Sequence, residues 1–205
     1  MTRLCMFSPA DADLERGWPG RIDGEHVIQL AAQTLQSFFA SGSNAREHAS
    51  FRLDDVLLRA PVLEPPAVRI FDDATTFRFA NPEAIRSPGA AIDRPAGRLD
   101  AVARLVAIVG AEGQIAGWTG LLEWLAPELT HPKDCDFCLL LGPVAATHLV
   151  DGFDWEGARA LASANTRLRP GDLLVGVPLA AYEDVQPGGF GHVFDGLGDL
   201  RAVVS

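Results

Sequence analysis

The sequence has little positive charge, few cysteines and no long apolar run. Lys and Arg total 17 against 27 Asp and Glu, which gives a formal net charge of -10. No basic stripe is present, so a nucleic-acid partner held through its phosphates is not expected. The N-terminal stretch MTRLCMFSPADAD lacks the apolar core of a signal peptide, and no apolar run reaches the length of a membrane span. We therefore expect a cytoplasmic protein with no membrane partner.

Three cysteines are too few for a disulfide framework, and we expect free thiols. Cys135 and Cys138 form a CxxC, but no second cysteine pair follows at zinc-site spacing. The tract DCDFCLLLG predicts an extended segment, which would place the two thiols on opposite faces. Two half-buried small side chains are therefore favoured over a shared metal or redox role. The five histidines are scattered, without a ligand pair at helix or strand spacing.

The chain is long enough for a substantial core and predicts two parts. Residues 1–64 form a predicted small N-terminal domain, and the stiff PVLEPP stretch leads into a larger domain, residues 65–205. In the first part the patterns predict strands at 3–7, 26–30 and 55–58, a helix at 32–40, a turn at 17–25 and a loop at 41–50.

From Val68 onward, short apolar runs alternate with Gly and Pro, which is typical of a β-rich domain. Strands are predicted in VRIF, RLVAIVG, QIAGWTG, FCLLLGPVAAT, DLLVGVPL and LRAVVS. Helices are predicted over Thr119–Leu129 and over Asp154–Ala164, where Asp154 would cap the first turn. The predicted fold class is α+β, mainly β.

In chain order, these pieces resemble the fumarylacetoacetate hydrolase family. The pieces are GRIDGEHVIQL, APVLEPPAVRIF, RSPGAAIDRP with RLDAVARLVAIVG, GQIAGWTGLLEW, KDCDFCLLLGP, LRPGDLLVGVP and DGLGDLRAVVS. Together they cover nearly the whole chain. The resemblance implies a mixed β-sheet roll, usually dimeric, with Mg²⁺ or another divalent ion such as Mn²⁺ held by three carboxylates. It also implies action on small β-diketo or 2-oxo acids by C–C hydrolysis, decarboxylation, hydration or isomerisation.

The carboxylates of that family are mostly missing here. Counted back from Gly110, the family's two paired glutamates fall on Val102 and Arg104, and neither side chain can bind Mg²⁺. The third carboxylate position falls on Glu123. We therefore expect no metal cofactor. The family's general-base histidine falls at or near Arg78, and segment 147–154 is shorter than the family's hairpin there.

The family resemblance predicts a role for Arg104. If Val102 and Arg104 share one strand face, the guanidinium points into the former metal cavity and pairs with Glu123. The alternative is that Arg104 reaches solvent or a dimer partner. Lys133 stands where the family has a substrate-contacting lysine, with an ordinary surface lysine as the alternative. The resemblance thus gives Glu123 and Lys133 as catalytic candidates, and Arg104, Arg78, Trp118 and Lys133 as substrate-binding candidates.

Two further arrangements stay open. A rearranged metal site would use Asp72, Asp73, Asp100 and Glu123. A cleft walled by Trp118 and Trp124 beside Glu123 would suit an apolar ligand with one acidic end, although core packing of both rings is favoured.

The predicted function is that of a divergent fumarylacetoacetate hydrolase-like homodimer that acts on a small 2-oxo or β-diketo acid without the usual divalent metal. The alternative is a non-catalytic relative, a pseudoenzyme, that binds a small molecule or supports a partner subunit. Substrate and reaction type stay open, because function lives in a site rather than in a fold.

Overall fold

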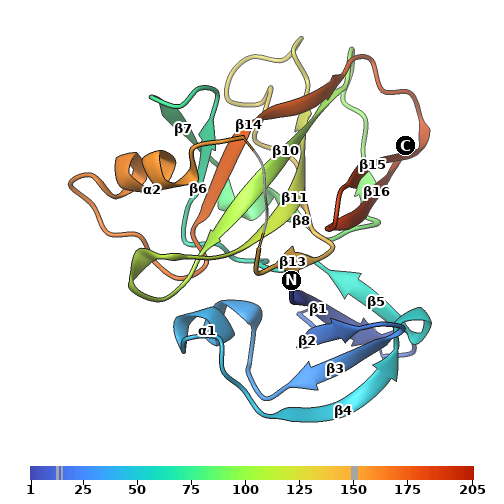
Figure 1. Cartoon of the computed structure of the whole chain (residues 1–205). Helices are drawn as coiled ribbons and strands as arrows, with labels where there is room; N and C mark the ends of the chain where they lie inside the picture. Colours follow the sequence, from blue (N-terminus) through green and yellow to red (C-terminus); the bar gives the residue numbers. More distant parts are fainter. Residues whose placement is uncertain (13, 15, 149–151) are drawn as a thin grey trace.

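A large mixed sheet and a small three-stranded sheet make up most of the computed structural model, which describes residues 1–12, 14, 16–148 and 152–205 (Figure 1). The strands are β1 (Arg3–Pro9), β2 (Trp18–Asp23), β3 (His26–Leu30), β4 (Glu47–Arg52), β5 (Val56–Arg59), β6 (Val68–Phe71), β7 (Phe77–Ala80), β8 (Ile85–Arg86), β9 (Ala91–Ile92), β10 (Asp100–Val109), β11 (Ile115–Leu125), β12 (Leu139–Leu141), β13 (Ala145–Ala146), β14 (Leu173–Tyr182), β15 (Gly188–Phe194) and β16 (Gly198–Val204). The helices are α1 (Leu35–Ala40) and α2 (Trp155–Ser163), with 3-10 turns at Leu53–Asp55, Pro82–Ala84 and Ala111–Gly113. The predicted class, mainly β with few helices, is confirmed.

The N-terminal strands form the lower part of Figure 1, with α1 beside them. The 17–25 stretch, predicted as a turn, is largely the strand β2, and the predicted loop at 41–50 runs into β4. Gly24 does lie in a turn, between β2 and β3, but Gly20 lies inside β2 and serves packing there. A Cβ on Gly20 would lie 2.5 Å from the Val27 side chain, so glycine lets β2 and β3 approach.

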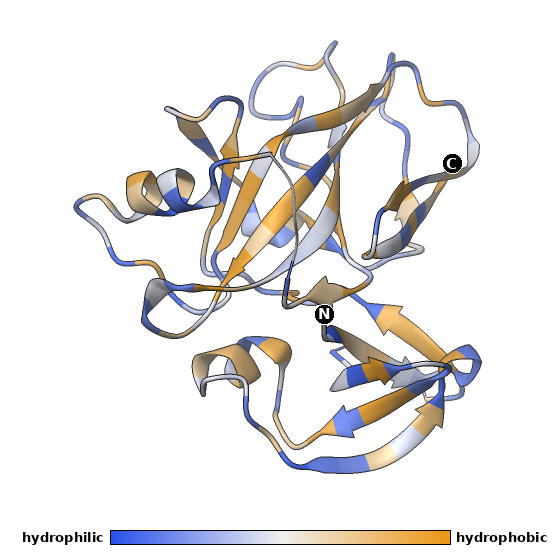
Figure 2. Ribbon diagram, viewed as in Figure 1, coloured by the Kyte–Doolittle hydropathy of each residue, from blue (hydrophilic) through white to orange (hydrophobic). Residues whose placement is uncertain are grey.

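Three long strands, β11, β10 and β14, form the middle of the large sheet. The helix predicted over Thr119–Leu129 is wrong, because this segment is mostly β11. Its side chains alternate between two cores: Leu121 packs in one apolar cluster, and Leu122 and Trp124 pack in another. A strand buried on both faces reads as a continuous apolar run, which periodicity cannot separate from a buried helix. Figure 2 shows apolar residues along these strands.

Other predicted elements agree more closely with the structure. Helix α2 lies within the predicted Asp154–Ala164 range, and the Asp154 side chain accepts a hydrogen bond from the Gly157 backbone N–H at 2.9 Å. The strand predicted in RLVAIVG, from Arg104 onward, begins at Asp100 in the structure, so Arg104 lies in the middle of β10. Part of the short 147–154 segment, residues 149–151, lies outside the described residues.

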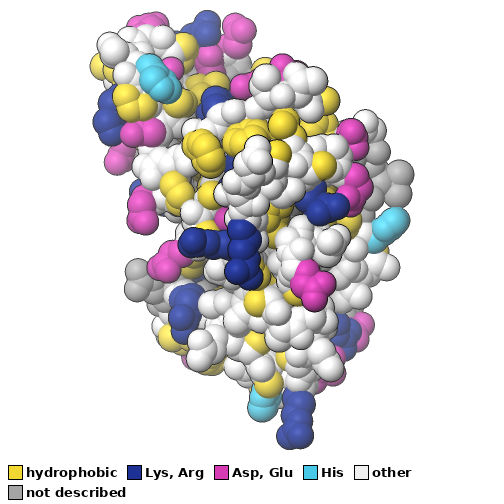
Figure 3. Space-filling view, turned by 90° about the vertical axis from the view of Figure 1, so that its left-hand side faces the viewer, with side chains coloured by type: hydrophobic (Ala, Val, Ile, Leu, Met, Phe, Trp, Pro, Cys, Tyr) yellow, Lys and Arg dark blue, Asp and Glu magenta, His cyan; other side chains and the backbone are white. Residues whose placement is uncertain are grey.

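The division at residue 64 stays a prediction. β1 pairs with β5 and, through Arg3 and Leu4, with β13. One apolar cluster contains Leu4 from the first part together with Val68 and Leu173 from the second. Within the described ranges, no helix is long and apolar enough to cross a membrane. On the face shown in Figure 3, basic and acidic side chains are interspersed, with one group of basic side chains near the centre.

The small sheet has the strand order β15-β16-β9 and packs against β11 through Phe194. A Cβ on Gly120 would lie 2.5 Å from Cδ2 of the buried Phe194 ring. We expect Gly120→Ala to lower the free energy of unfolding by about 1–3 kcal/mol, since the ring must be displaced. Urea unfolding followed by tryptophan fluorescence measures the change.

The matched control for this substitution is Gly189→Ala. Gly189 lies on β15, and no described atom comes within 4 Å of a Cβ built there. Its effect is expected to stay within about 0.5 kcal/mol. Equal stability of both variants would show that Phe194 repacks freely, contrary to this account.

Candidate functional site

Arg104 is the centre of the candidate site. Its side chain is only 4% exposed, yet four hydrogen bonds satisfy it. Nε donates to Glu123 Oε2 at 2.9 Å, and Nη2 donates to Asp72 Oδ1 at 3.0 Å. Nη1 donates to the backbone carbonyls of Phe71 at 3.2 Å and Gly176 at 3.1 Å. The predicted pairing of Arg104 with Glu123 is therefore present, and the alternative in which Arg104 reaches solvent is wrong.

Glu123 is fully buried on β11, and both of its oxygens accept from guanidinium groups. Arg104 occupies Oε2, and Arg78 of β7 donates to Oε1. Arg78 also pairs with Asp72, at 3.4 Å from Nε to Oδ2. Two cations and two anions thus form one connected cluster of Asp72, Arg78, Arg104 and Glu123, which we call the Arg104 network.

The local backbone explains why these four side chains meet. β6 runs parallel to β14, which in turn pairs with β10, so Asp72, just after β6, comes beside Arg104. β7 folds back on β6 and carries Arg78 opposite Ile70. Val102 and Glu123 are paired directly across β10 and β11, and Arg104 is two residues further along the same face. The arrangement follows from strand register.

The two positive and two negative charges of the network balance, but its four side chains differ in their exposure to solvent. Asp72 is 57% exposed and Arg78 is 35% exposed, whereas Arg104 and Glu123 are buried. Burial opposes the charge of Arg78, but the adjacent carboxylates of Glu123 and Asp72 outweigh that effect and raise the pKa of its guanidinium. Solvent therefore reaches the network at its Asp72–Arg78 edge.

The residues present do not fit the divalent ion that the family resemblance implies. Mg²⁺ needs near-octahedral oxygen ligands at about 2.0–2.1 Å. At the three corresponding positions stand Val102, Arg104 and Glu123, and the guanidinium of Arg104 already occupies Glu123 Oε2. A divalent cation at this point would face another cation and an apolar side chain, which does not match the three-carboxylate ligand set that the resemblance implies.

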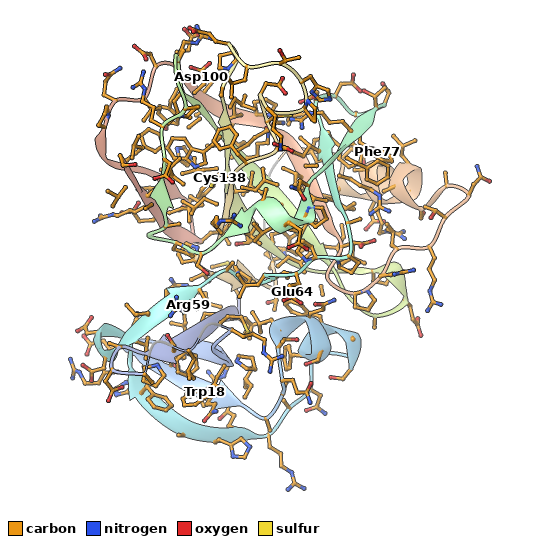
Figure 4. All side chains as sticks on the ribbon, turned by 180° about the vertical axis from the view of Figure 1, so that it is seen from behind. Trp18, Arg59, Glu64, Phe77, Asp100 and Cys138 are labelled. Atoms are coloured by element: carbon orange, nitrogen blue, oxygen red, sulfur yellow. The ribbon has the colours of Figure 1, made fainter. Side chains whose placement is uncertain are left out.

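The rearranged metal site is also not assembled in the described part of the chain. Asp72 and Glu123 belong to the Arg104 network. Asp73 instead closes a turn by accepting hydrogen bonds from the Thr75 and Thr76 backbone, which, together with their hydroxyls, lower its pKa. Asp100 pairs with Arg98 at 2.8 Å. Figure 4 labels Asp100 near the end of the molecule, at the start of β10.

Lys133 and Trp118 lie apart from the network. Lys133, the only lysine of the chain, is 74% exposed, and its ion pair within the described residues is with Asp136 at 3.0 Å. Trp118 is five positions from Glu123 on β11 and so points to the opposite face, where it packs against the same cluster as Trp124. The two rings therefore do not face Glu123: Trp124 is a core residue, and the partly buried Trp118 packs against the same core.

The segment between β11 and β12 is a turn rather than the extended stretch predicted from DCDFCLLLG. Cys138 is buried just before β12 (Figure 4), while Cys135 lies in the turn and is partly exposed. All three cysteines are free, as predicted. Burial raises the pKa of the Cys135 thiol to about 11; Asp134 adds to this rise, and Arg78 opposes it. The turn therefore lies within electrostatic reach of the Arg104 network.

Sequence reasoning missed two parts of this site. It placed Arg78 at the missing histidine position, but no pattern indicated that Arg78 would share Glu123 with Arg104. It treated Asp72 only as a metal ligand. A signal was available, since two arginines and two acids placed around one buried position suggest mutual neutralisation.

The fold that carries this network is that of the fumarylacetoacetate hydrolase family, as the sequence resemblance predicted. Maleylpyruvate hydrolase from Sphingobium sp. SYK-6 superposes with a TM-score of 0.78 at 19% identity, covering 98% of each chain. A second structure of that enzyme is in complex with manganese(II) ion and pyruvate.

Two mycobacterial proteins are similar to the same extent. 2-Hydroxyhepta-2,4-diene-1,7-dioate isomerase from Mycobacterium marinum has a TM-score of 0.78 at 21% identity, over 100% of this chain and 98% of the other. 5-Carboxymethyl-2-hydroxymuconate delta-isomerase from Mycobacterium smegmatis has a TM-score of 0.77 at 19% identity, over 98% of both chains. No protein-family model and no curated protein matches the sequence.

Proposed function

We propose that this chain binds a small 2-oxo or β-diketo acid at the Asp72–Arg78 edge of the Arg104 network, and acts on it without Mg²⁺ or Mn²⁺ in the network. The observation that carries the proposal is the position of Arg104, whose buried guanidinium pairs with both Asp72 and Glu123. The shared fold with hydrolases and isomerases of small acids supports it.

Arg78 is the group proposed to meet the ligand. It is partly exposed, and its partner Asp72 is the most exposed member of the network. A ligand carboxylate can replace Asp72 on Arg78, because a guanidinium offers parallel donors that match a carboxylate. Arg104 keeps its backbone partners during this exchange, so it supplies a fixed positive charge behind the ligand.

The reaction class proposed is C–C cleavage, decarboxylation, hydration or isomerisation, as the family resemblance implies. Glu123 is the buried acid closest to the proposed ligand position. Both of its oxygens accept from guanidinium groups, so it can accept a proton only after Arg78 has left Oε1. A ligand carboxylate that draws Arg78 away from Glu123 as well as from Asp72 would provide that release. Lys133 would join the site only if its side chain left Asp136.

A non-catalytic role is the second candidate. It is favoured by the saturation of Arg104 and Glu123, since both oxygens of the only buried acid in the network already accept from arginines. Cavities of about 660 and 690 Å³ are lined by other residues, among them Gln36, Arg169 and Glu64. Under this alternative, the protein binds an oxo acid without turning it over. A homodimer and a cytoplasmic location belong to both proposals, and sedimentation analysis tests the former.

Arg78→Ala should weaken oxo-acid binding at least tenfold, since a charge-assisted hydrogen bond contributes about 1.5–3 kcal/mol. The measurement is calorimetric titration of pyruvate and of acetylpyruvate, a 2,4-diketo acid, into chelator-treated protein. Arg201→Ala is the matched control, because Arg201 is an exposed arginine paired only with Asp199 among the described residues.

Three outcomes bear on the proposal. Metal-independent binding that Arg78→Ala weakens, and Arg201→Ala does not, supports it. Binding that appears only when Mg²⁺ or Mn²⁺ is returned would overturn the metal-free account. Conversion of the diketo acid is monitored by its ultraviolet absorbance. Binding without conversion selects the non-catalytic candidate.

A further inference from the structure

Three potential metal ligands of different chemistry meet in the turn between β11 and β12. One ligand atom each from His131, Asp134 and Cys135 lies within 4.8 Å of the others. His131 Nδ1 is 3.1 Å from Asp134 Oδ1 and 4.0 Å from Cys135 Sγ. Around a tetrahedral ion with ligand bonds of about 2.0–2.3 Å, neighbouring donors stand roughly 3.3–3.8 Å apart. Small side-chain rotations would bring the three donors to that geometry.

The backbone of this turn is held independently of the three side chains. Lys133 N–H donates to Thr130 O at 2.9 Å, and Cys135 N–H donates to Pro132 O at 3.2 Å. Ala126 N–H donates to Asp134 O at 2.7 Å, which ties the turn to the end of β11. The backbone that carries the ligands is thus ordered before an ion binds, which limits the entropy lost on binding to that of the side chains.

The donor set selects the kind of ion. Imidazole nitrogen and thiolate sulfur suit zinc and similar borderline ions, whereas magnesium and calcium need oxygen. Three protein ligands also leave the fourth tetrahedral position for water or a ligand, which is the pattern of an open rather than a closed structural site. His131 is exposed, so an ion reaches the cluster directly from solvent.

We propose that His131, Asp134 and Cys135 form a binding site for one Zn²⁺-class divalent ion per chain. This site is separate from the Arg104 network and does not depend on the proposed oxo-acid function. It uses none of the positions where the family resemblance places a metal, namely Val102, Arg104 and Glu123. It also gives the Cys135 thiol and His131 a common role as metal ligands, which the sequence did not indicate.

Cobalt titration tests the proposal. Chelator-treated protein is titrated with Co²⁺, whose bond to a thiolate gives a charge-transfer band in the near ultraviolet, and with Zn²⁺ in a calorimeter. We expect one ion per chain, with the band abolished in Cys135→Ser. Affinity should fall at least tenfold in both His131→Ala and Asp134→Asn, because each change removes one ligand.

Two controls separate ligation from charge attraction and from general thiol binding. Glu128→Gln removes an exposed acid of the same turn that is outside the cluster, and Cys138→Ala removes the buried thiol. Both should bind Co²⁺ as the unaltered protein does. Circular dichroism verifies that each variant is folded.

Absence of the charge-transfer band in the folded, unaltered protein would overturn the proposal and leave a His131–Asp134 ion pair that only supports the turn. Equal affinity in all variants would overturn it as well. Neither result bears on the metal-independent oxo-acid binding, which is measured on chelator-treated protein before any metal is returned.

Discussion

Arg104→Ala is expected to lower the free energy of unfolding by about 3–5 kcal/mol, the range for removing one partner of a buried ion pair. The substitution removes a guanidinium that is 4% exposed and takes a hydrogen bond away from Glu123. It also leaves the carbonyls of Phe71 and Gly176 without their side-chain donor. Urea unfolding, monitored by tryptophan fluorescence, measures the loss.

The companion variant for Arg104 is the double change Arg104→Met with Glu123→Leu. Replacing a buried ion pair by apolar side chains of similar size is often neutral or stabilising, so most of the stability should return. Arg78 then turns toward solvent and Asp72, since it is already partly exposed. If Arg104→Ala costs less than about 1 kcal/mol, the network is weakly coupled to the fold and the reasoning is wrong.

Asp172→Ala is expected to destabilise the protein by about 3 kcal/mol or more, because it leaves a buried cation behind. Asp172 Oδ2 accepts from Arg69 Nη1 at 3.1 Å and from the Arg169 backbone N–H at 3.1 Å, and the Asp172 and Arg69 side chains are both buried. The Arg69 guanidinium also lies over the rings of Phe77 and Phe79. Thermal and urea unfolding both report the effect.

The conservative control for Asp172 is Asp172→Asn, which keeps one oxygen acceptor for the Arg169 N–H but removes the charge. It should cost less than the alanine change. The asparagine amide would replace either Oδ2 or the Oδ1 that has no hydrogen-bond partner among the described residues. Equal losses for both variants would show that charge, rather than the turn contact, governs this position.

Much of the fold is accessible from the sequence, because apolar runs and Gly/Pro punctuation determine most strands. Helix α2 is found through Asp154, a residue whose side chain caps the first turn. The Thr119–Leu129 segment is mispredicted as a helix because β11 is buried on both faces, which removes the alternation that identifies a strand. Gly17, Gly20 and Gly24 suggest a turn over 17–25, whereas close packing against Val27 is what requires Gly20.

The candidate site is predicted in part. The resemblance, which places Arg104 and Glu123 at two of the family's carboxylate positions, predicts that they pair, and the register of β10 and β11 explains why they do. Arg78 and Asp72 reach the same acid and the same arginine through the pairing of β6 with β14 and β7, which no local pattern reveals. The meeting of His131 with Cys135 is missed because an extended reading of the segment separates side chains that a turn brings together.

The pairing of β1 with β13 has a consequence for synthesis on the ribosome. Arg3 and Leu4 obtain their partners from Ala146 and Ala145, far along the chain. At roughly 5–20 residues per second, about 7–30 s pass between the emergence of these two segments. β5 covers only Met6–Pro9 in that interval, so the start of β1 is an open strand edge on the nascent chain. A chaperone that covers this edge would prevent it from pairing with other chains.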